Sequence, residues 1–384
     1  MFGPVCRWLA DRQTCTPRVL SLCELRGFST PTNEILSTGA SCKKMIPMRL
    51  SKTSFPRKAV RKHGNGRLGR LLRALVWYGI VRYTPETKEN GPNLVVLPND
   101  TAYPYDILVH QLRARGIPFL LMQEGIRFEL PSIAKNGRQY GQGGANAVAT
   151  WGAGSAEYFE RIGVAPPQIY LVGNPRLDDL KTRDWSDSAG SLAKRLGIAS
   201  EVLLYVTNPI DQQGFCTTAE KYSCFLEFVH SADSFLTSSG YQLLVKIHTG
   251  ESLEGYRAAL KDTALKNHAI IVKDEPLYPL LHLARAVVTL ASTTGLEALL
   301  MDRPLGVLPI PGHGYVYDFV ENAGAVALDS TVGLEDLLTT LVNDPLSARE
   351  KRNKYIGHQI SNLGCAAEAN GRLIMQLIQS QEDL

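Results

Sequence analysis

The stretch from Val287 to Leu300, which reads VVTLASTTGLEALL, indicates how the chain folds. It opens with a short apolar run that is typical of a strand buried on both faces. The run breaks at small hydroxyl residues and a glycine, and a helix-forming segment begins at Leu296. A strand, a hydroxyl-rich turn and a helix N-terminus direct backbone N–H groups at one spot, which suits a phosphate. The alternative is that residues 292–294 only cap the helix.

The same alternation of short apolar strands and helical patterns extends outward from this stretch over residues 93–345. The predicted strands are 93–97, 119–122, 147–150 and 168–172, and then 201–207, 241–247, 269–273, 286–290, 304–308 and 325–328. Such alternation is typical of parallel sheets with helical crossovers. The sequence therefore predicts an α/β fold with two doubly wound, Rossmann-like domains that face a cleft.

Composition shifts along the chain suggest the domain boundaries. We expect a basic N-terminal extension over residues 1–65 that is disordered or is untranslated upstream sequence. A short N-terminal α/β domain (66–180), a polar linker (181–192), a C-terminal α/β domain (193–345) and closing helices (346–384) are expected to follow. The first α/β domain is short, because residues 66–180 supply few strand–helix units.

The net charge of +4 over 384 residues conceals a strong asymmetry. Residues 1–85 carry 16 Lys and Arg against 3 acidic residues, whereas the remainder is acidic. Residues 43–82 lack acidic side chains and fit either an amphipathic helix on an anionic membrane surface or a solvated tail. The acidic body argues against a nucleic-acid partner.

Apolar runs and cysteines place further limits on the class of protein. No apolar run reaches the roughly 20 residues that a membrane-spanning helix needs. The 7 cysteines have no metal-ligand or disulfide spacing, which indicates reduced thiols and no zinc site. We expect a cytoplasmic protein, with peripheral attachment to the inner face of the membrane through residues 43–82 as an open alternative.

Polar residues that follow the predicted strands are the site candidates, because ligands bind beyond the carboxyl ends of parallel strands. In the second domain a Lys246-x-His248 pair faces the hydroxyl-rich turn by topology, which favours a phosphate or diphosphate clamp. In the first domain Glu124 is the only carboxylate that ends an apolar strand and precedes a glycine, so it is a candidate general base or a helix cap. Further cleft-lining candidates are Asp100, Asn174 and Asn208.

Two segments resemble the GT-B superfamily of glycosyltransferases. Residues 170–180, YLVGNPRLDDL, resemble the segment that ends the N-domain in that superfamily, and residues 287–304, VVTLASTTGLEALLMDRP, are similar to the nucleotide-sugar segment of capsule polysaccharide transferases. Some of those transferases use a CMP-activated sugar. The resemblance implies an acceptor-side domain over residues 66–180 and a nucleotide-sugar-binding domain over residues 193–345.

The resemblance also implies roles for individual residues. By similarity to bacterial sialyltransferases, Glu124 would be the base, His248 would contact the CMP phosphate, and a Ser/Thr pair would complete the site. The nucleotide- and phosphate-binding candidates are Lys246, Ser292, Thr293, Thr294 and Gly295, and the ribose and base candidates are Glu275 and Glu297. The implied reaction is an inverting sugar transfer, without metal or cofactor, from a nucleotide-sugar to a glycan or glycolipid acceptor in surface polysaccharide synthesis.

Other functions stay open at this stage. Residues 99–101 and 117–127 resemble UDP-N-acetylglucosamine 2-epimerases, although residues 207–211 lack the His and Arg that those enzymes carry at this point. A CDP-glycerol-type phosphotransferase and a catalytically inactive GT-B scaffold share the layout. The sequence does not identify the sugar, the nucleotide, the acceptor or the oligomeric state.

Overall fold

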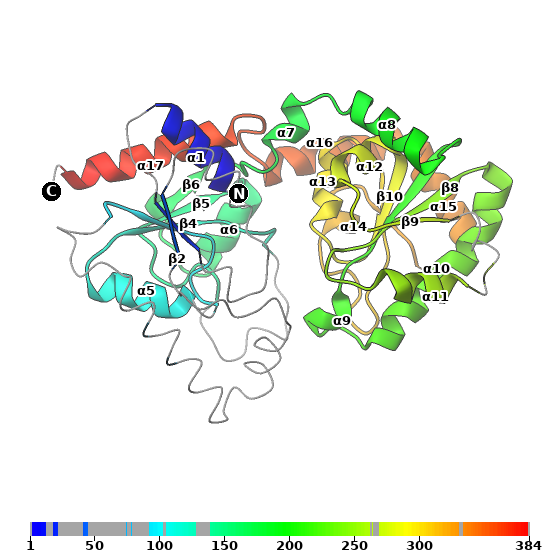
Figure 1. The fold of residues 1–384 in the computed structure, drawn as a ribbon, viewed down its shortest axis with the longest axis horizontal. Helices are drawn as coiled ribbons and strands as arrows, with labels where there is room; N and C mark the ends of the chain where they lie inside the picture. The colour runs from blue at the N-terminus through cyan, green and yellow to red at the C-terminus, as the bar shows by residue number, and fades with distance from the viewer. Residues whose placement is uncertain are drawn as a thin grey trace. The chain divides into compact units, whose positions relative to one another are not determined.

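The structure, a computed structural model, describes residues 2–12, 18–21, 41–44, 74, 78, 92–102, 105–127, 139–261, 263, 269–329 and 333–382. The chain divides into two compact units (Figure 1). Unit 1 comprises Met1–Asp178 and Ile360–Leu384, and unit 2 comprises Asp179–Gln359. Each unit contains a parallel sheet with helices packed on it, which confirms the predicted α/β class.

Unit 1 is built on four parallel strands that lie side by side in chain order. They are β3 (Val95–Leu97), β4 (Phe119–Met122), β5 (Ala147–Thr150) and β6 (Ile169–Leu171). Helix α5 (Tyr105–Ala114) connects β3 to β4, and α6 (Ala153–Arg161) connects β5 to β6 through a short 3-10 turn at Pro166–Gln168. The order of the described strands in unit 1 does not reverse, and all their carboxyl ends lie along one edge.

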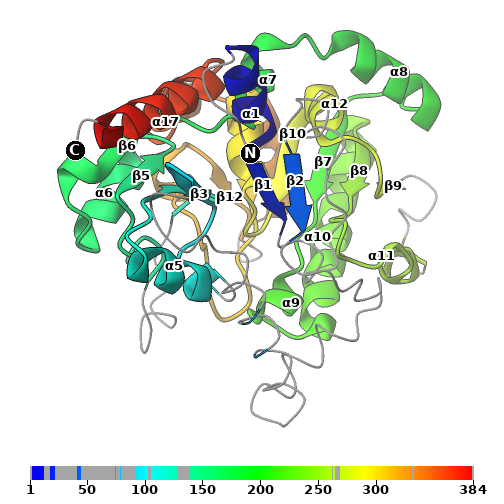
Figure 2. The same ribbon diagram turned by 60° about the vertical axis from the view of Figure 1, so that its left-hand side comes forward.

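Successive side chains of β4 pack on opposite faces of this sheet. Phe119 and Leu121 pack toward α5 and α6, whereas Leu120 and Met122 pack toward the two terminal helices. These are α1 (Phe2–Asp11) and α17 (Ala366–Glu382), which lie against each other in unit 1 (Figures 1 and 2). Because all four β4 residues are buried, the strand reads as a continuous apolar run in the sequence.

Helix α1 corrects the expectation of disorder over the first residues of the chain. Val5 and Leu9 are buried against the sheet, and Trp8 lies over Gly371 of α17, where a Cβ would overlap the indole ring. The apolar spacing of three and four residues gives α1 one buried face. Strands β1 (Arg18–Ser21) and β2 (Ser41–Lys44) pair in parallel. Apart from residues 43, 44, 74 and 78, the basic segment 43–82 lies outside the described residues.

The segment Gly-Asn-Pro-Arg-Leu-Asp at residues 173–178 attaches α17 to the sheet of unit 1. The carboxylate of Asp178 accepts hydrogen bonds from the backbone N–H groups of Gly364 at 3.1 Å, Ala366 at 2.9 Å and Ala367 at 2.8 Å. These bonds satisfy donors at the N-terminus of α17 that the helix itself cannot satisfy. The amide of Asn370 donates to the carbonyl oxygens of residues 172 and 173, which fixes the helix from its other side.

Replacing Gly173 with alanine is expected to destabilise unit 1. Gly173 has a φ of +79°, and a Cβ there would overlap the carbonyl oxygen of Ser361. The matched control is Gly163→Ala, because Gly163 has a φ of +94° with nothing within 4 Å of the added Cβ. The control should lose about 1–2 kcal/mol from the left-handed conformation alone. Urea unfolding should show a larger loss for Gly173→Ala, and equal losses in the two variants would contradict this packing.

Unit 2 is built on six parallel strands in the order β12-β11-β10-β7-β8-β9. Their bounds are β7 (Val202–Val206), β8 (Gln242–Lys246), β9 (Ile270–Val272), β10 (Ala284–Thr289), β11 (Leu305–Val307) and β12 (Val326–Ala327). The first strand, β7, lies in the middle, with β8 on one side and β10 on the other (Figure 2). The strand order therefore reverses between β7 and β10, as in a doubly wound dinucleotide-binding sheet.

Helices cover both faces of the sheet in unit 2. They are α8 (Ser186–Leu196), α9 (Ile210–Gln213), α10 (Thr218–Ser239), α11 (Leu253–Leu260), α12 (Leu277–Leu283), α13 (Thr294–Leu300), α14 (Phe319–Asn322), α15 (Leu334–Asn343) and α16 (Leu346–Gln359). The largest apolar cluster of the unit joins β7 and β8 to α10, α11 and α15. In contrast, α17 follows α16 in the chain but belongs to unit 1.

The polar stretch predicted as a linker, residues 181–192, is largely helical. Helix α7 (Asp178–Thr182) and α8 occupy it, and α8 packs against α12. Ala189 and Leu192 are buried on one side of α8, whereas most of its polar side chains face solvent. The polar composition of this segment therefore comes from the exposed face of a helix, which explains the error.

A buried arginine anchors α16 to the rest of unit 2. The Arg352 side chain is 2% exposed, and its guanidinium group bonds the carboxylate of Asp302 at 2.7 Å and that of Asp344 at 2.9 Å. Both aspartates lie in turns with positive φ, at +55° and +47°. The planar guanidinium group can satisfy two carboxylates at once, and it therefore ties these two turns to α16.

Candidate functional site

The carboxyl edge of the unit 2 sheet gathers polar residues from three neighbouring strands. Asn208 follows β7, His248 follows β8, and Ser292 and Thr293 follow β10. These strands flank the point where the strand order reverses. In open parallel sheets such a point forms the crevice in which ligands bind.

Asn208 connects the ends of β7 and β10 directly. Asn208 is only 7% exposed, and its side-chain amide nitrogen donates to the carbonyl oxygen of Ala291. The orientation of the amide follows from that bond, because a carbonyl oxygen only accepts. The other end, Oδ1, has no hydrogen-bond partner among the described residues. A buried unpaired acceptor costs about 1–3 kcal/mol, so this oxygen is suited to a donor from outside the chain.

The hydroxyl-rich turn divides into an accessible half and a buried half. Ser292 is half-buried and Thr293 is exposed, whereas Thr294 and Gly295 are buried. A Cβ at Gly295 would lie 2.7 Å from the Phe319 ring, so the glycine permits close packing. Of the four residues predicted to bind phosphate in this turn, Ser292 and Thr293 are the accessible ones.

Three of the backbone N–H groups in this turn are bonded within it, which corrects the geometry expected from the sequence. The N–H of Thr294 donates to the Ser292 hydroxyl at 3.2 Å, and the N–H of Gly295 donates to the Ser292 carbonyl at 3.0 Å. The N–H of Leu296 donates to the Thr293 carbonyl at 3.0 Å. An anion bound here would therefore find these three groups already bonded. The Ser292 hydroxyl accepts the N–H of Thr294, whereas Thr293, the N-cap of α13, makes no side-chain cap bond.

His248 lies in an exposed turn immediately after β8. Its Nδ1 accepts the backbone N–H of Gly250 at 3.0 Å, and the backbone N–H of His248 donates to the Thr207 hydroxyl at 2.9 Å. Partial loss of solvation lowers the pKa of the imidazole, and the positive charges of Lys246 and Lys273 act in the same direction, whereas Glu251 opposes them. In the neutral ring the proton then belongs on Nε2, since Nδ1 is an acceptor.

Lys246, the last residue of β8, is half-buried and is bonded within the chain. Its ammonium group donates to the carbonyl oxygen of Lys273 at the end of β9. Burial lowers the pKa of Lys246, and the carboxylates of Asp274 and Glu275 oppose this change. Lys246 therefore supplies positive charge near the edge of the sheet.

The two predicted ribose-binding carboxylates both have partners within unit 2. Glu275 pairs with Arg195 of α8. Glu297 of α13 is 9% exposed and accepts a hydrogen bond from the Tyr278 hydroxyl at 3.4 Å. Contact with a ribose would require either carboxylate to exchange or share its partner.

In unit 1, Glu124 is exposed in the turn that follows β4. Its backbone N–H donates to the Tyr140 hydroxyl at 3.2 Å, and the Arg127 guanidinium group lies 4.1 Å from the centre of the Tyr140 ring. The preceding Gln123 is fully buried, with Oε1 accepting the N–H of Trp151 at 2.8 Å and Nε2 donating to Ser155 at 2.8 Å. Gln123 thus holds the turn in place, and Glu124 presents its carboxylate at the carboxyl edge of the sheet.

Asp100 and Asn174, which were predicted to line the cleft, are both buried, at 2% and 3% exposure. The Asp100 carboxylate accepts the N–H groups of Gly141 at 2.9 Å and Gly143 at 2.7 Å. Burial raises the pKa of Asp100, although these hydrogen bonds oppose the change. Asn174 forms a turn in which its Oδ1 accepts the N–H of Arg176 at 3.0 Å. Both residues shape loops of unit 1.

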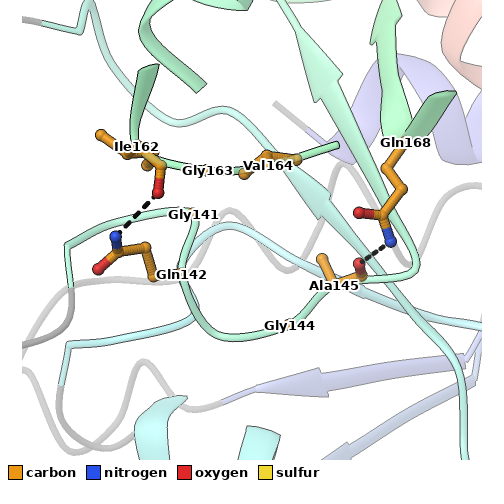
Figure 3. Close-up of a pocket in the computed structure, with 8 residues that line it drawn as sticks. All are labelled: Gly141, Gln142, Gly144, Ala145, Ile162, Gly163, Val164 and Gln168. Atoms are coloured by element: carbon orange, nitrogen blue, oxygen red, sulfur yellow. Dashed lines mark hydrogen bonds between the residues drawn. The ribbon is translucent and has the colours of Figure 1, made fainter. Parts of the chain in front are cut away.

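Unit 1 also has a pocket of about 420 Å³, shown in Figure 3. It is lined by Gly141, Gln142, Gly144, Ala145, Ile162, Gly163, Val164 and Gln168. The amides of the two glutamines are bonded to carbonyl oxygens of the lining, at 2.9 Å and 3.3 Å. None of the predicted site residues lines this pocket.

Sequence reasoning missed the buried charges next to His248. Glu251 is 4% exposed and Lys221 is 6% exposed, and they form an ion pair at 3.1 Å. Glu251 stands three residues after the predicted histidine, but Lys221 lies on α10, far away in sequence. The short distance in sequence between Glu251 and His248 was the only feature that could have indicated this ion pair.

Within the described ranges, no group of three or more His, Cys, Asp or Glu side chains could hold a metal ion. Metal independence of the reaction nevertheless stays a prediction. Across the part of the chain that the structure describes, no helix is long and apolar enough to cross a membrane.

The two parallel sheets, one of which has the Rossmann strand order, define an α/β protein of the GT-B-like class. Within this class the chain is similar to capsule polysaccharide synthesis proteins: the sequence model of the family described as "Capsule polysaccharide biosynthesis protein" matches residues 220–316. The match includes His248 and the turn at residues 292–295. A comparison with curated proteins finds no match.

Solved structures share the fold over almost the whole chain. S. aureus MnaA in complex with UDP has a TM-score of 0.62 at 12% identity, covering 100% of this chain and 94% of that one. UDP-GlcNAc 2-epimerase from Neisseria meningitidis, bound to UDP-GlcNAc, has a TM-score of 0.61 at 11% identity, covering 99% and 96%. A variant of the wall teichoic acid polymerase TagF has a TM-score of 0.59 at 14% identity, covering 98% and 85%.

Proposed function

We propose that this chain is a glycosyltransferase that binds a nucleotide-activated sugar, by preference a CMP-sugar, at the carboxyl edge of the unit 2 sheet. The observation that carries the proposal is the gathering of Asn208, His248, Ser292 and Thr293 where the strand order reverses. The match to the capsule polysaccharide family, over residues 220–316, includes three of these four residues and supports the same assignment.

In this proposal the donor phosphate is held by neutral hydrogen-bond donors and a nearby positive charge. The Nε2–H of His248 and the hydroxyl groups of Ser292 and Thr293 donate to its oxygens, and Lys246 adds positive charge. Donors fixed in advance stabilise the charge that develops on the leaving nucleotide, so the reaction needs no metal ion. The unpaired Oδ1 of Asn208 accepts a hydroxyl proton of the ribose or the sugar, whereas ribose contacts from Glu275 and Glu297 stay a prediction.

Glu124 is the proposed general base of unit 1. A carboxylate at the edge of the sheet can take the proton of an acceptor hydroxyl, and direct attack by that hydroxyl inverts the anomeric carbon. The acceptor class that fits the family match is a glycan or glycolipid in surface polysaccharide synthesis. The cytoplasmic location, and attachment to the inner face of the membrane through residues 43–82, also stay predictions. That segment lies almost wholly outside the described residues.

The experiment that tests this function follows the fate of two donors. We expect the purified protein to release CMP from a CMP-activated sugar, slowly with water and faster with a capsule-type glycan acceptor. UDP-N-acetylglucosamine should remain unchanged in the same buffer, as followed by proton NMR of its sugar. Epimerisation of that compound without turnover of CMP-sugars would overturn the proposal and favour the epimerase alternative. Binding of CMP without turnover of any donor would favour an inactive scaffold.

A further inference from the structure

A buried carboxylate lies behind the exposed histidine turn of unit 2. Both oxygens of Glu251 are bonded: Oε2 accepts the Thr207 hydroxyl at 2.5 Å, and Oε1 accepts the Tyr256 hydroxyl at 2.8 Å and contacts the Lys221 ammonium group at 3.1 Å. Lys221 also pairs with Asp211 at 3.0 Å. The carboxylate therefore connects the end of β7, helix α10 and helix α11 at one point.

The Thr207 hydroxyl connects the Glu251 carboxylate to the backbone of His248. The Thr207 hydroxyl has one proton, which goes to Glu251, so its lone pairs are left to accept the backbone N–H of His248 at 2.9 Å. The turn is closed at its other end, because the N–H of Glu251 donates to the His248 carbonyl at 2.9 Å. Within the turn, the N–H of Gly250 donates to Nδ1 of the imidazole at 3.0 Å.

We propose that Glu251 and Thr207 are positioning residues that fix the turn of His248, in which Nδ1 accepts the Gly250 N–H and Nε2–H is available as the hydrogen-bond donor to a ligand phosphate. The identity of the ligand rests on the proposed function, but the state of the imidazole does not. Glu251 was not predicted as part of the site.

The surroundings of His248 as a whole favour the neutral ring, mainly through desolvation. Partial desolvation lowers the pKa of the imidazole below its ordinary 6.5, the neighbouring Lys246 and Lys273 lower it further, and Glu251 acts in the opposite sense. Protonation of Nδ1 would also remove the acceptor for the Gly250 N–H. The bonded turn is therefore expected to be stable above pH 6.5 and to weaken as the pH falls through the lower pKa of the folded protein.

The ion pair itself is a weak explanation for why these charges are buried. Burial opposes the charge on Lys221, yet hydrogen bonds to Asp211 and Glu251 outweigh it and raise the pKa of the lysine. A buried ion pair often adds little to stability compared with apolar side chains of the same volume. Apolar residues could not accept the proton of the Thr207 hydroxyl. The Glu251 carboxylate accepts it and thereby orients the hydroxyl oxygen toward the backbone N–H of His248.

The first test is the state of the imidazole in the free protein, which needs no nucleotide. The chain has 8 histidines, and His248→Ala identifies the resonances of His248 by their disappearance. Nitrogen-15 NMR should show a proton on Nε2 and a titration midpoint below 6.5. Thr207→Ser should preserve both results, and Thr207→Val should give a mixture of tautomers. A His248 that is protonated on Nδ1, or that is unchanged in Thr207→Val, would overturn the proposal even if CMP binds.

The second test is a double-mutant cycle on CMP affinity. Thr207→Val removes the hydroxyl at nearly constant volume and should weaken CMP about tenfold, the loss expected for one hydrogen bond. In a His248→Ala background the same change should have little further effect, because Thr207 acts through the histidine. Thr207→Ser is the control and should bind CMP like the unmodified protein. A tenfold loss in both backgrounds would show that Thr207 acts independently of His248, which would contradict the positioning role.

Discussion

Glu124→Gln is expected to reduce the rate of donor turnover by about 10²–10⁴-fold, the usual contribution of a general base. The amide has the shape of the carboxylate but cannot take a proton from the acceptor hydroxyl. Glu124 is exposed, and its turn is held by its backbone bond to Tyr140 at 3.2 Å, so the substitution should leave unit 1 folded. The rate of CMP release from the donor, in the presence of an acceptor, is the measurement.

The control for this prediction is Glu160→Gln, which makes the same chemical change at an exposed position of α6 in the same unit. Its turnover and its CMP affinity should both match those of the unmodified protein. Full turnover in Glu124→Gln would mean that another group removes the proton. Loss of CMP affinity would instead make Glu124 a binding residue and end its assignment as the base.

Arg352→Ala is expected to lower the free energy of unfolding of unit 2 by about 3–5 kcal/mol, as when one partner of a buried ion pair is removed. Arg352 is 2% exposed, and its loss would leave the buried carboxylate of Asp344 with only the half-exposed Arg349, which bonds it at 2.8 Å. The two positive-φ turns at Asp302 and Asp344 would also lose their common bond. Urea unfolding followed by circular dichroism measures the change.

Arg372→Ala is the matched control, because Arg372 pairs with Glu368 on the surface of α17 with 73% of its side chain exposed. An exposed helical pair contributes about 0.3–0.5 kcal/mol, so this variant should unfold almost like the unmodified protein. Equal unfolding midpoints for the two variants would show that the buried bonds of Arg352 contribute no more than a surface pair.

The strands were the most predictable part of the fold. The runs 119–122 and 147–150 were predicted with the bounds that β4 and β5 have, because strands buried on both faces are uninterrupted apolar runs. The strand of the opening stretch was placed at 286–290 and lies at Ala284–Thr289. Arg285 at its start is exposed and bonds the Val342 carbonyl, so it gave no apolar signal.

The long-range attachments could not be predicted from local patterns. The sequence near Asp178 shows only a turn-like segment, and its caps on α17 depend on backbone groups more than 180 residues away in the chain. Likewise, α1 is too short to be recognised by propensity, and its burial depends on Gly371 in α17. These contacts explain why the expected disorder of the first residues was wrong.

The placement of the candidate residues at one edge of the sheet was predictable, whereas the state of their side chains was not. The rule that polar residues collect after parallel strands located His248 and Ser292 correctly at one edge of unit 2. The same rule cannot distinguish exposed from buried side chains, which is why Asp100 was expected to line a cleft although it is 2% exposed. It also cannot show that Lys246 and Glu275 already have partners in the folded chain.

We propose above that the carboxyl edge of unit 2 binds a cytidine nucleotide. The most direct measurement is the thermal shift of the unmodified protein and of His248→Ala with CMP, CDP, UDP and GDP, because a ligand that binds the folded state raises its apparent stability. We expect CMP to raise the melting temperature of the unmodified protein most, and His248→Ala to lose most of that shift. A response to UDP alone, or a CMP shift that is unchanged in His248→Ala, would contradict the claim.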